Sequence, residues 1–258
     1  MISCIIVVSI ILVILIVIFI YYGNNKIDIE EFDYHTNLNI NERLLVLSDL
    51  HAKKFGKNNY KLINEVKSLS PSIILIPGDL VDSHRDKLDA VMALLNELNK
   101  IAICIYISGN HERREKKEFY QNLLEMISKT NTIILNDKKF NYKGIDFIGI
   151  ESKKKKETAK IVYETLKTDG FMIVLNHEPE YFKEFVGASI VVSGHAHGGQ
   201  IRLFKKGLFS PGQGLFPKYT SGLYQEAGIN LYVSRGLGGK DFRIRLFNRP
   251  HLILINLK

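Results

Sequence analysis

Five short polar clusters, each directly after an apolar run, constrain the fold of this sequence more than any other feature. They are Asp49-Leu50-His51, Gly78-Asp79, Gly109-Asn110-His111, Asn176-His177 and Gly194-His195-Ala196-His197. The runs before them have the length and composition of buried strands. In open α/β sheets, ligands gather beyond the carboxyl ends of the strands. We therefore expect the five clusters to be delivered to one sheet edge, where they form a common site.

Strand-like and helix-like segments alternate over most of the chain. Short apolar runs predict strands at 44–47, 73–76, 102–107, 133–135, 171–175 and 190–192, with a hairpin at 140–150. Apolar residues have helical spacing at 60–69, 88–98, 119–127 and 158–167. The last third has strand-like segments at 201–203, 231–233 and 252–255 between Gly-rich loops. The pattern predicts one α/β domain over residues 42–258, with two packed sheets and helices outside.

The N-terminal segment has a different character. From Cys4 to Tyr22 the chain is almost continuous Ile, Val and Leu, about the length that crosses a hydrocarbon core. It lacks the basic start and small-residue site of a cleavable signal peptide. We expect a single-pass transmembrane anchor at 1–22 and a linker at 23–41, with a buried core helix as the alternative. Because Lys26 follows the segment and no Lys or Arg precedes it, the positive-inside rule favours a domain on the cytoplasmic side.

The charge of the chain indicates an anionic partner. The formal net charge is +8, and every charged residue lies after position 25. A basic surface attracts anions. The densest basic run is Lys153 to Lys156, which fits either a solvated loop or a contact with anionic lipid head groups.

The residue types in the clusters are those of a metal site. In extended backbone, residues i and i+2 point to the same side, so Asp49 with His51 and His195 with His197 are natural ligand pairs. Such pairs can hold two ions at the separation found in two-metal hydrolases. Asp79 is our candidate for a carboxylate that bridges both ions.

The donor set also limits the metal. The amide oxygen of Asn110, neutral imidazoles and the lack of a thiolate ligand favour a Mn, Fe, Zn or Co pair, with Mn as the first choice. Two divalent ions against the carboxylates of Asp49 and Asp79 leave about two positive charges uncompensated. That surplus suits a phosphoryl group, so the site predicts phosphate chemistry.

With these residues in view, a family resemblance emerges. Asp-Leu-His, Gly-Asp-Leu-Val-Asp, Gly-Asn-His-Glu, a later His and Gly-His-Ala-His resemble the signature of the calcineurin-like metallophosphoesterases, from about Arg43 to the C-terminus. The resemblance implies a four-layer αββα sandwich with two metal ions. It implies that one ion is held by Asp49, His51, Asp79 and His197, and the other by Asp79, Asn110, His177 and His195. It further implies that His111 is not a ligand but acts at the leaving group, as a general acid or transition-state stabiliser.

Other motifs narrow the branch. Gly198-Gly199-Gln200-Ile201, Ser221-Gly222-Leu223-Tyr224 and Ser234-Arg235-Gly236-Leu237-Gly238 resemble the membrane-associated YaeI/YkuE-like phosphoesterases, which are similar to UDP-2,3-diacylglucosamine pyrophosphatases. Two positions depart from the family pattern. Glu112 replaces the usual Asp after the catalytic His, which leaves the partner that orients His111 open. His251 replaces an acidic residue after Pro250, a change that we expect at the substrate rim.

The sequence thus predicts a dinuclear-metal phosphoesterase acting on a phosphodiester or pyrophosphate bond of a membrane-associated lipid such as UDP-2,3-diacylglucosamine. Arg235 and Arg245, with Lys240 and Arg243, are candidate contacts to an anionic head group, and apolar residues between Phe204 and Phe216 are a candidate lip for acyl chains. Ordinary solvation and packing explain both features as well.

Two alternatives remain. A soluble nucleotide or nucleic-acid phosphodiesterase suits the net charge, but we find no aromatic and basic stripe of the kind that stacks bases. A non-catalytic, metal-stabilised membrane scaffold belongs to a different class. Such a scaffold is expected to have lost ligands or the catalytic His, and this chain retains the full set.

Overall fold

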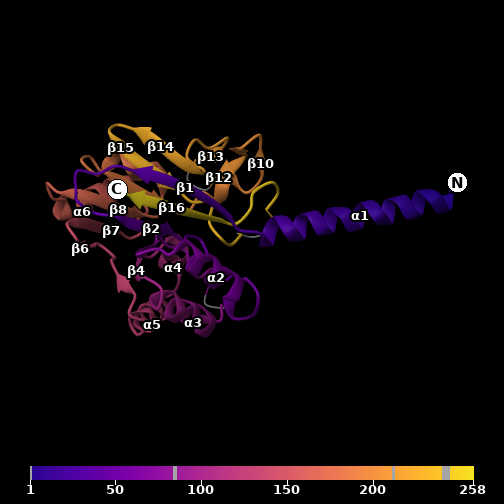
Figure 1. Cartoon of the computed structure of the whole chain (residues 1–258), viewed down its shortest axis with the longest axis horizontal. Coiled ribbons are helices and arrows are strands. Elements are labelled where there is room, and N and C mark those ends of the chain that lie inside the picture. The colour runs from indigo at the N-terminus through magenta and orange to yellow at the C-terminus, as the bar shows by residue number, and fades with distance from the viewer. Residues whose placement is uncertain (1, 84–85, 211–212, 240–244) are drawn as a thin grey trace.

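Two six-stranded sheets lie face to face between helices in the computed structural model, which describes residues 2–83, 86–210, 213–239 and 245–258 (Figure 1). The first sheet has the strand order β1 (Asp28–Tyr34), β16 (His251–Leu257), β2 (Glu42–Val46), β3 (Ile73–Ile76), β4 (Ile103–Tyr106) and β5 (Ile133–Ile134). The second has the order β14 (Gly222–Glu226), β15 (Ile229–Val233), β9 (Ile190–Ser193), β8 (Phe171–Asn176), β7 (Ile145–Ile150) and β6 (Lys138–Tyr142).

Helices cover the outer face of each sheet. The first sheet packs against α2 (Tyr60–Leu69), α3 (Leu88–Asn99) and α5 (Lys117–Ser128), and the second against α6 (Lys156–Leu166) and the 3-10 helix η2 (Pro179–Glu184). Short elements complete the described chain: η1 (Lys57–Asn59), α4 (Asn110–Arg114), η3 (His197–Gly199), and two small hairpins, β10 (Arg202–Leu203) with β11 (Lys206–Gly207) and β12 (Phe209–Ser210) with β13 (Gly214–Leu215).

The period of two along each strand accounts for the layers. Leu44 and Val46 point into the apolar cluster between the sheets, whereas Leu45 points into the cluster beneath α2, α3 and α5. Strands that are buried on both faces read as continuous apolar runs, which is how they appear in the sequence. The predicted αββα sandwich is confirmed.

The polar clusters follow parallel strands, so they leave the sheets side by side. β2, β3 and β4 pair in parallel, and so do β8 and β9. Backbone hydrogen bonds then join the loops: the N–H of Asp49 donates to the carbonyl of Gly78 at 3.1 Å, and the N–H of Gly194 donates to the carbonyl of His177 at 3.2 Å. The sheets thereby place all five clusters at one site.

The segment that was expected to be a linker, 23–41, instead contains a strand. Asp28–Tyr34 forms β1 at the sheet edge and pairs in parallel with β16 over its whole length. Its inward side chains include Phe32, whose ring lies 5.3 Å from that of Tyr232, while the alternate positions are exposed. The acidic residues at this edge masked the period of two in the sequence. The first sheet thus begins at Asp28, ahead of the domain boundary expected at residue 42.

The apolar N-terminal helix stands away from the sandwich. α1 (Ile2–Asn25) projects from one end of the domain (Figure 1). Within it, Ile6–Asn25 is long and apolar enough to cross a bilayer, and none of that window is buried. This exposure contradicts the alternative of a buried core helix. The orientation across a membrane stays a prediction.

Candidate metal centre

The loops that carry the predicted ligands turn sharply. β2 ends at Val46, and Asp49 and His51 both have a φ of 48°, in the left-handed region. His195 and His197 have φ values of 67° and 47°. The i and i+2 pairs are therefore not in extended backbone, and the reasoning that placed them side by side was wrong in that respect. Non-glycine residues in this region store strain, which is typical of functional sites.

Glycines allow these loops to approach each other. A Cβ on Gly194 would lie 1.9 Å from Oγ of Ser48 and 2.4 Å from Oδ2 of Asp49. Gly78 has a φ of 98°, and a Cβ there would lie 2.8 Å from Nδ1 of His177. Any larger residue at either position would push the clusters apart.

Four of the predicted ligands form one compact group. Asp49, His51, Asp79 and His197 each offer a ligand atom, and these atoms all lie within 4.8 Å of one another. Nε2 of His51 lies 3.2 Å from Nε2 of His197 and 3.8 Å from Oδ2 of Asp79. All four residues are buried.

The other predicted ligands lie on the far side of Asp79. Nε2 of His177 is 3.2 Å from Oδ2 of Asp79 and 3.0 Å from Oδ1 of Asn110. Nδ1 of His195 is 2.7 Å from the same Asn110 oxygen. The structure thus brings all seven predicted ligands together, with Asp79 shared between the two groups.

The hydrogen bonding around His177 calls for a cation. Its Nδ1 donates to the carbonyl of Pro77 at 2.7 Å, so the neutral ring presents a lone pair at Nε2. That lone pair faces two acceptor oxygens, Oδ1 of Asn110 and Oδ2 of Asp79, and the Asp79 oxygen is buried with no hydrogen-bond donor among the described residues. Three acceptors in contact repel unless a proton or a metal ion lies among them. The residues present therefore fit a metal ion.

The pKa values of the ligand residues also indicate that a cation belongs at this site. Burial alone would raise the pKa of Asp79, but His177, His51 and His111 together hold that pKa well below its usual value. Burial likewise opposes protonation of His177, yet Asp79 lifts the pKa of His177 well above its usual value. Asp49 has its pKa raised by complete burial. A divalent ion beside these carboxylates would keep both ionised.

His111 lies at the edge of this centre, partly exposed. Its Nδ1 is 2.7 Å from Oδ1 of Asp82, and its Nε2 is 4.0 Å from Oδ2 of Asp79. Asp82, which sequence reasoning did not single out, is the partner that orients the ring; its signal was the second Asp of Gly-Asp-Leu-Val-Asp. Asp82 also lies 3.4 Å from Nδ1 of His51, so His51, Asp82 and His111 form a second group able to hold an ion.

Glu112, which stands where the family commonly has Asp, holds the backbone of the ligand loops. Its buried carboxylate accepts hydrogen bonds from the backbone N–H groups of Asp79, Leu80 and Gly109 at 3.1, 2.6 and 3.0 Å. It therefore ties two ligand loops together, whereas the His111 ring is paired with Asp82.

The two arginines predicted to contact substrate lie in unlike places. Arg245 is buried and donates to the carbonyls of Gly236 and Gly238 at 2.8 and 2.6 Å, so its guanidinium holds a loop. Arg235 is partly exposed and forms an ion pair with Asp28 at 3.1 Å. A substrate contact stays a prediction for both. Lys240 and Arg243 lie outside the described residues.

A pocket of about 520 Å³ opens beside the second ligand group. It is lined by Asn110, Arg113, Arg114, Ser152, Lys153, Lys154, Glu178, Glu180, Tyr181 and His195. Lys153 forms an ion pair with Glu151 at 3.1 Å, whereas Lys154 is exposed. The basic run thus borders the candidate centre, together with Arg113 and Arg114, which sequence reasoning missed.

His251 had been expected at the substrate rim. The structure instead places it fully buried on β16. Its Nδ1 accepts a hydrogen bond from the backbone N–H of Arg235 at 3.2 Å, and its Nε2 faces Glu30 at 3.5 Å. A carboxylate here would face Glu30 across a buried interface. An imidazole instead meets Glu30 as a complementary partner.

Burial lowers the pKa of His251 to about 4, and we expect acid to destabilise the fold through it. The unfolded chain binds this proton below a pH of about 6.5, whereas the folded chain does not until a pH of about 4. The free energy of unfolding therefore has its full value above a pH of about 6.5. It falls by about 3 kcal/mol as the pH drops to about 4. Thermal unfolding of the full chain in detergent should show this loss, and His251→Gln should flatten it. Equal pH dependence of the two proteins would contradict the assignment.

A family model of calcineurin-like phosphoesterases matches residues 42–199. The chain belongs to this family. The crystal structure of TT1561 of Thermus thermophilus is similar with a TM-score of 0.52 at 11% identity, over 77% of this chain and 91% of that chain, which supports the fold.

Curated relatives agree with the branch indicated by the motifs. The uncharacterized metallophosphoesterase Cj0846 of Campylobacter jejuni is 30% identical over 86% of this chain and 60% of its own length. The uncharacterized metallophosphoesterase YkuE of Bacillus subtilis is 30% identical over 82% of this chain and 76% of its own length. LpxG of Chlamydia muridarum, named a UDP-2,3-diacylglucosamine pyrophosphatase, is 26% identical over 83% of this chain and 82% of its own length. The chain spans about three fifths of the Campylobacter relative.

Proposed function

We propose that the protein is a dinuclear-metal phosphoesterase that hydrolyses a phosphodiester or pyrophosphate bond of a membrane-associated lipid. The observation that carries the proposal is the convergence of two ligand groups on Asp79. Oδ2 of Asp79 accepts no hydrogen bond from the described residues. It lies 3.2 Å from Nε2 of His177 and 3.8 Å from Nε2 of His51, and these two histidines belong to different ligand groups. A carboxylate in this position is suited to bridge two ions.

In this proposal, each ion has four ligands from the chain. Asp49, His51, Asp79 and His197 would hold one, and Asp79, Asn110, His177 and His195 the other. Nitrogen and oxygen donors favour Mn, with Fe, Zn or Co as alternatives. When bound, such ions lower the pKa of water and stabilise charge on a phosphoryl group.

His111 would act as the general acid. Asp82 holds the ring through Nδ1, which leaves Nε2 directed toward the centre. A proton held on Nε2 can pass to the leaving oxygen of the substrate as the ester bond breaks. Asp82 is then a positioning residue that keeps the ring in this orientation.

The substrate class follows from what surrounds the centre. Arg114 and Lys154 border the adjoining pocket without an ion pair among the described residues and can pair with a second anionic group, such as the other phosphate of a diphosphate. α1 would hold the enzyme at a bilayer, on the cytoplasmic face if Lys26 sets the orientation. The name of the relative LpxG supports a glycolipid diphosphate of the UDP-2,3-diacylglucosamine type.

The test compares three esters with the full-length protein in detergent: UDP-2,3-diacylglucosamine, bis(4-nitrophenyl) phosphate and a short single-stranded DNA. We expect Mn-dependent hydrolysis, with kcat/KM for the lipid about 100-fold above the soluble esters, or about 2.7 kcal/mol of added transition-state binding. Chelation of the metal should abolish turnover of all three.

Each other outcome excludes a part of the proposal. Equal turnover of lipid and soluble esters would exclude the lipid preference and leave the phosphoesterase in place. A preference for DNA would favour the nucleic-acid phosphodiesterase. No hydrolysis with Mn, Fe, Zn or Co would overturn the enzyme and favour the scaffold.

A further inference from the structure

Large apolar side chains are exposed on the two small hairpins and the loop before β16. Phe204 is 98% exposed, Phe216 75%, Leu215 74% and Phe247 67%. We call these four residues the hairpin face. Phe204 and Phe247 line one cavity and so adjoin each other, and adjoining exposed apolar surface marks a place of contact.

The tip of the first hairpin adds strain to exposure. Phe204 and Lys205 form the two-residue turn between β10 and β11, and their φ values are 48° and 67°. Turns of this kind favour Asn and Gly, because a bulky side chain is disfavoured at positive φ. Nothing within the described domain covers Phe204 in return. The free-energy cost of this strained and exposed turn therefore points to a partner outside the domain.

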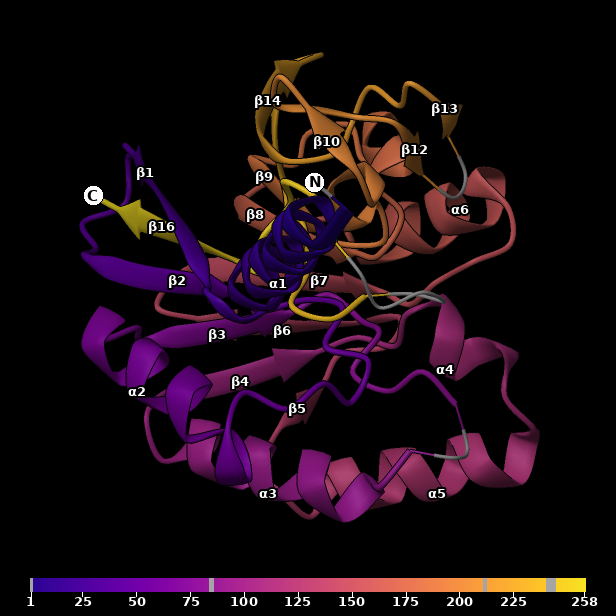
Figure 2. The same cartoon turned by 90° about the vertical axis from the view of Figure 1, so that its right-hand side faces the viewer.

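The hairpin face is continuous with α1. Figures 1 and 2 show β10, β12 and β13 at the end of the domain from which α1 departs. The ring of Phe247 lies 5.5 Å from that of Phe19, on α1. The base of the helix is fastened as well: the backbone N–H of Arg245 donates to Asn24 at 2.9 Å, and Lys53 donates to the Asn24 carbonyl at 2.5 Å. Phe247 therefore has a fixed position relative to the helix, and the hairpins lie at the same end of the domain.

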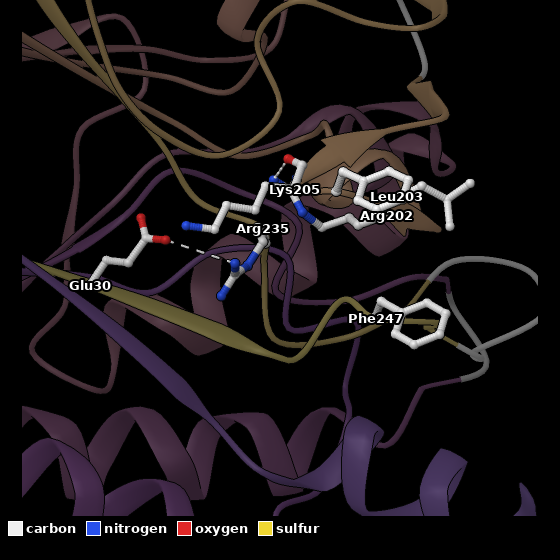
Figure 3. Close-up of a pocket in the computed structure, with 7 residues that line it drawn as sticks. Glu30, Arg202, Leu203, Lys205, Arg235 and Phe247 are labelled. Carbon is white, nitrogen blue, oxygen red and sulfur yellow. Dashed lines mark hydrogen bonds and ion pairs between the residues drawn. The ribbon is translucent and has the colours of Figure 1, made fainter.

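A cavity of about 430 Å³ adjoins the hairpin face (Figure 3). It is lined by Glu30, Arg202, Leu203, Phe204, Lys205, Arg235 and Phe247. Arg235 pairs with Glu30 at 3.8 Å, but its Nε is buried without a hydrogen-bond partner among the described residues. Lys205 extends its side chain toward the side of Glu30 (Figure 3), and no ion pair of Lys205 occurs among the described residues. The lining thus carries three cations against one carboxylate.

We propose that the hairpin face docks into the head-group region of the bilayer that α1 enters, and that the adjoining cavity binds the phosphate of an anionic phospholipid. Phe204 and Phe216 then lie at the depth where aromatic side chains partition into the interface. Lys205 and Arg235 meet the phosphate, and the acyl chains run beside Phe247 and α1. The inference depends on α1 as a membrane helix but not on the catalytic proposal.

Tryptophan fluorescence can test the docking, since the chain contains no Trp. The full-length protein is placed in nanodiscs with brominated acyl chains, which quench nearby indoles. Phe204→Trp should lose most of its emission and shift to shorter wavelength. Ile161→Trp is the matched control, because Ile161 is 66% exposed but lies on α6, at the end of the domain away from α1 (Figure 1). Val13→Trp, on α1, reports insertion of the helix.

The outcomes separate cleanly. Quenching at Phe204→Trp and Val13→Trp but not at Ile161→Trp supports docking. Equal emission from Phe204→Trp and Ile161→Trp overturns it, since the domain would then stand clear of the lipid. A lack of quenching at Val13→Trp overturns both the anchor and the docking. None of these readouts depends on turnover.

The lipid site has its own test, with Phe216→Trp as the reporter because Phe204 adjoins Lys205. Quenching should be greater in discs that contain phosphatidylglycerol than in phosphatidylcholine alone. Lys205→Glu should remove this difference, and Lys160→Glu on α6 should keep it. Equal quenching in both lipids, or no effect of Lys205→Glu, would overturn the anionic lipid site.

Discussion

Asp79→Asn is expected to lower kcat/KM for metal-dependent hydrolysis by about 10³-fold. The variant keeps an oxygen that can accept the backbone N–H of His111, which donates to Oδ1 of Asp79 at 2.9 Å, so the loops stay in place. The amide, however, brings a nitrogen donor and no charge to the point where His51 and His177 converge. Loss of a bridging carboxylate removes several kcal/mol of transition-state stabilisation, or about three decades in kcat/KM.

Binding of metal gives a second readout for the same variant. A ligand at 100 times its Kd stabilises the folded protein by about 2.7 kcal/mol, so Mn should raise the unfolding temperature of the wild type. This increase should nearly vanish in Asp79→Asn. Asp89→Asn is the matched control, since Asp89 is exposed in the first turn of α3. A variant that retains both the metal-dependent stabilisation and the activity would refute the bridging role.

Most of the fold followed from the sequence because its signals are local. Runs such as 73–76 are apolar at every position, and the structure has β3 at Ile73–Ile76. The helix predicted at 60–69 is α2, Tyr60–Leu69. β1 escaped detection because its partner β16 lies at the other end of the sequence, and because acidic residues stand on both its half-buried and its exposed face. A strand of this kind is defined by its partner and not by its own pattern.

Some features of the candidate site could likewise be predicted from the sequence, and others could not. The ligand residues follow buried strands, so their convergence could be predicted from topology. The turned backbone at Asp49 and His51 could not, because Asp and His are only modestly enriched at positive φ and most of them adopt other conformations. The roles of Asp82 and Glu112 depend on which side chain reaches His111 across two loops. Such contacts are set by tertiary packing.

His111→Ala is expected to lower kcat by about 10²- to 10⁴-fold, the usual contribution of a general acid, while both metal ions stay bound. The reason is that Nε2 of His111 faces the centre, 4.0 Å from Oδ2 of Asp79, while Nδ1 is paired with Asp82. The ring is thus placed to give a proton to the leaving group. The loss should be greater for an alkyl leaving group than for 4-nitrophenolate, which departs without a proton. Asp82→Asn should change kcat in the same direction by less, because the ring keeps a hydrogen-bond acceptor.

Metal content decides between this role and a competing one. His51, Asp82 and His111 form a group whose ligand atoms lie within 4.8 Å of one another, so His111 is also placed to bind an ion. If it does, His111→Ala should lose about one ion per chain, and the loss of rate should be the same for both leaving groups. If His111 is the acid, the ions stay and the leaving-group dependence appears. Elemental analysis of the purified variant, combined with the two esters, therefore assigns the residue to proton transfer or to metal binding.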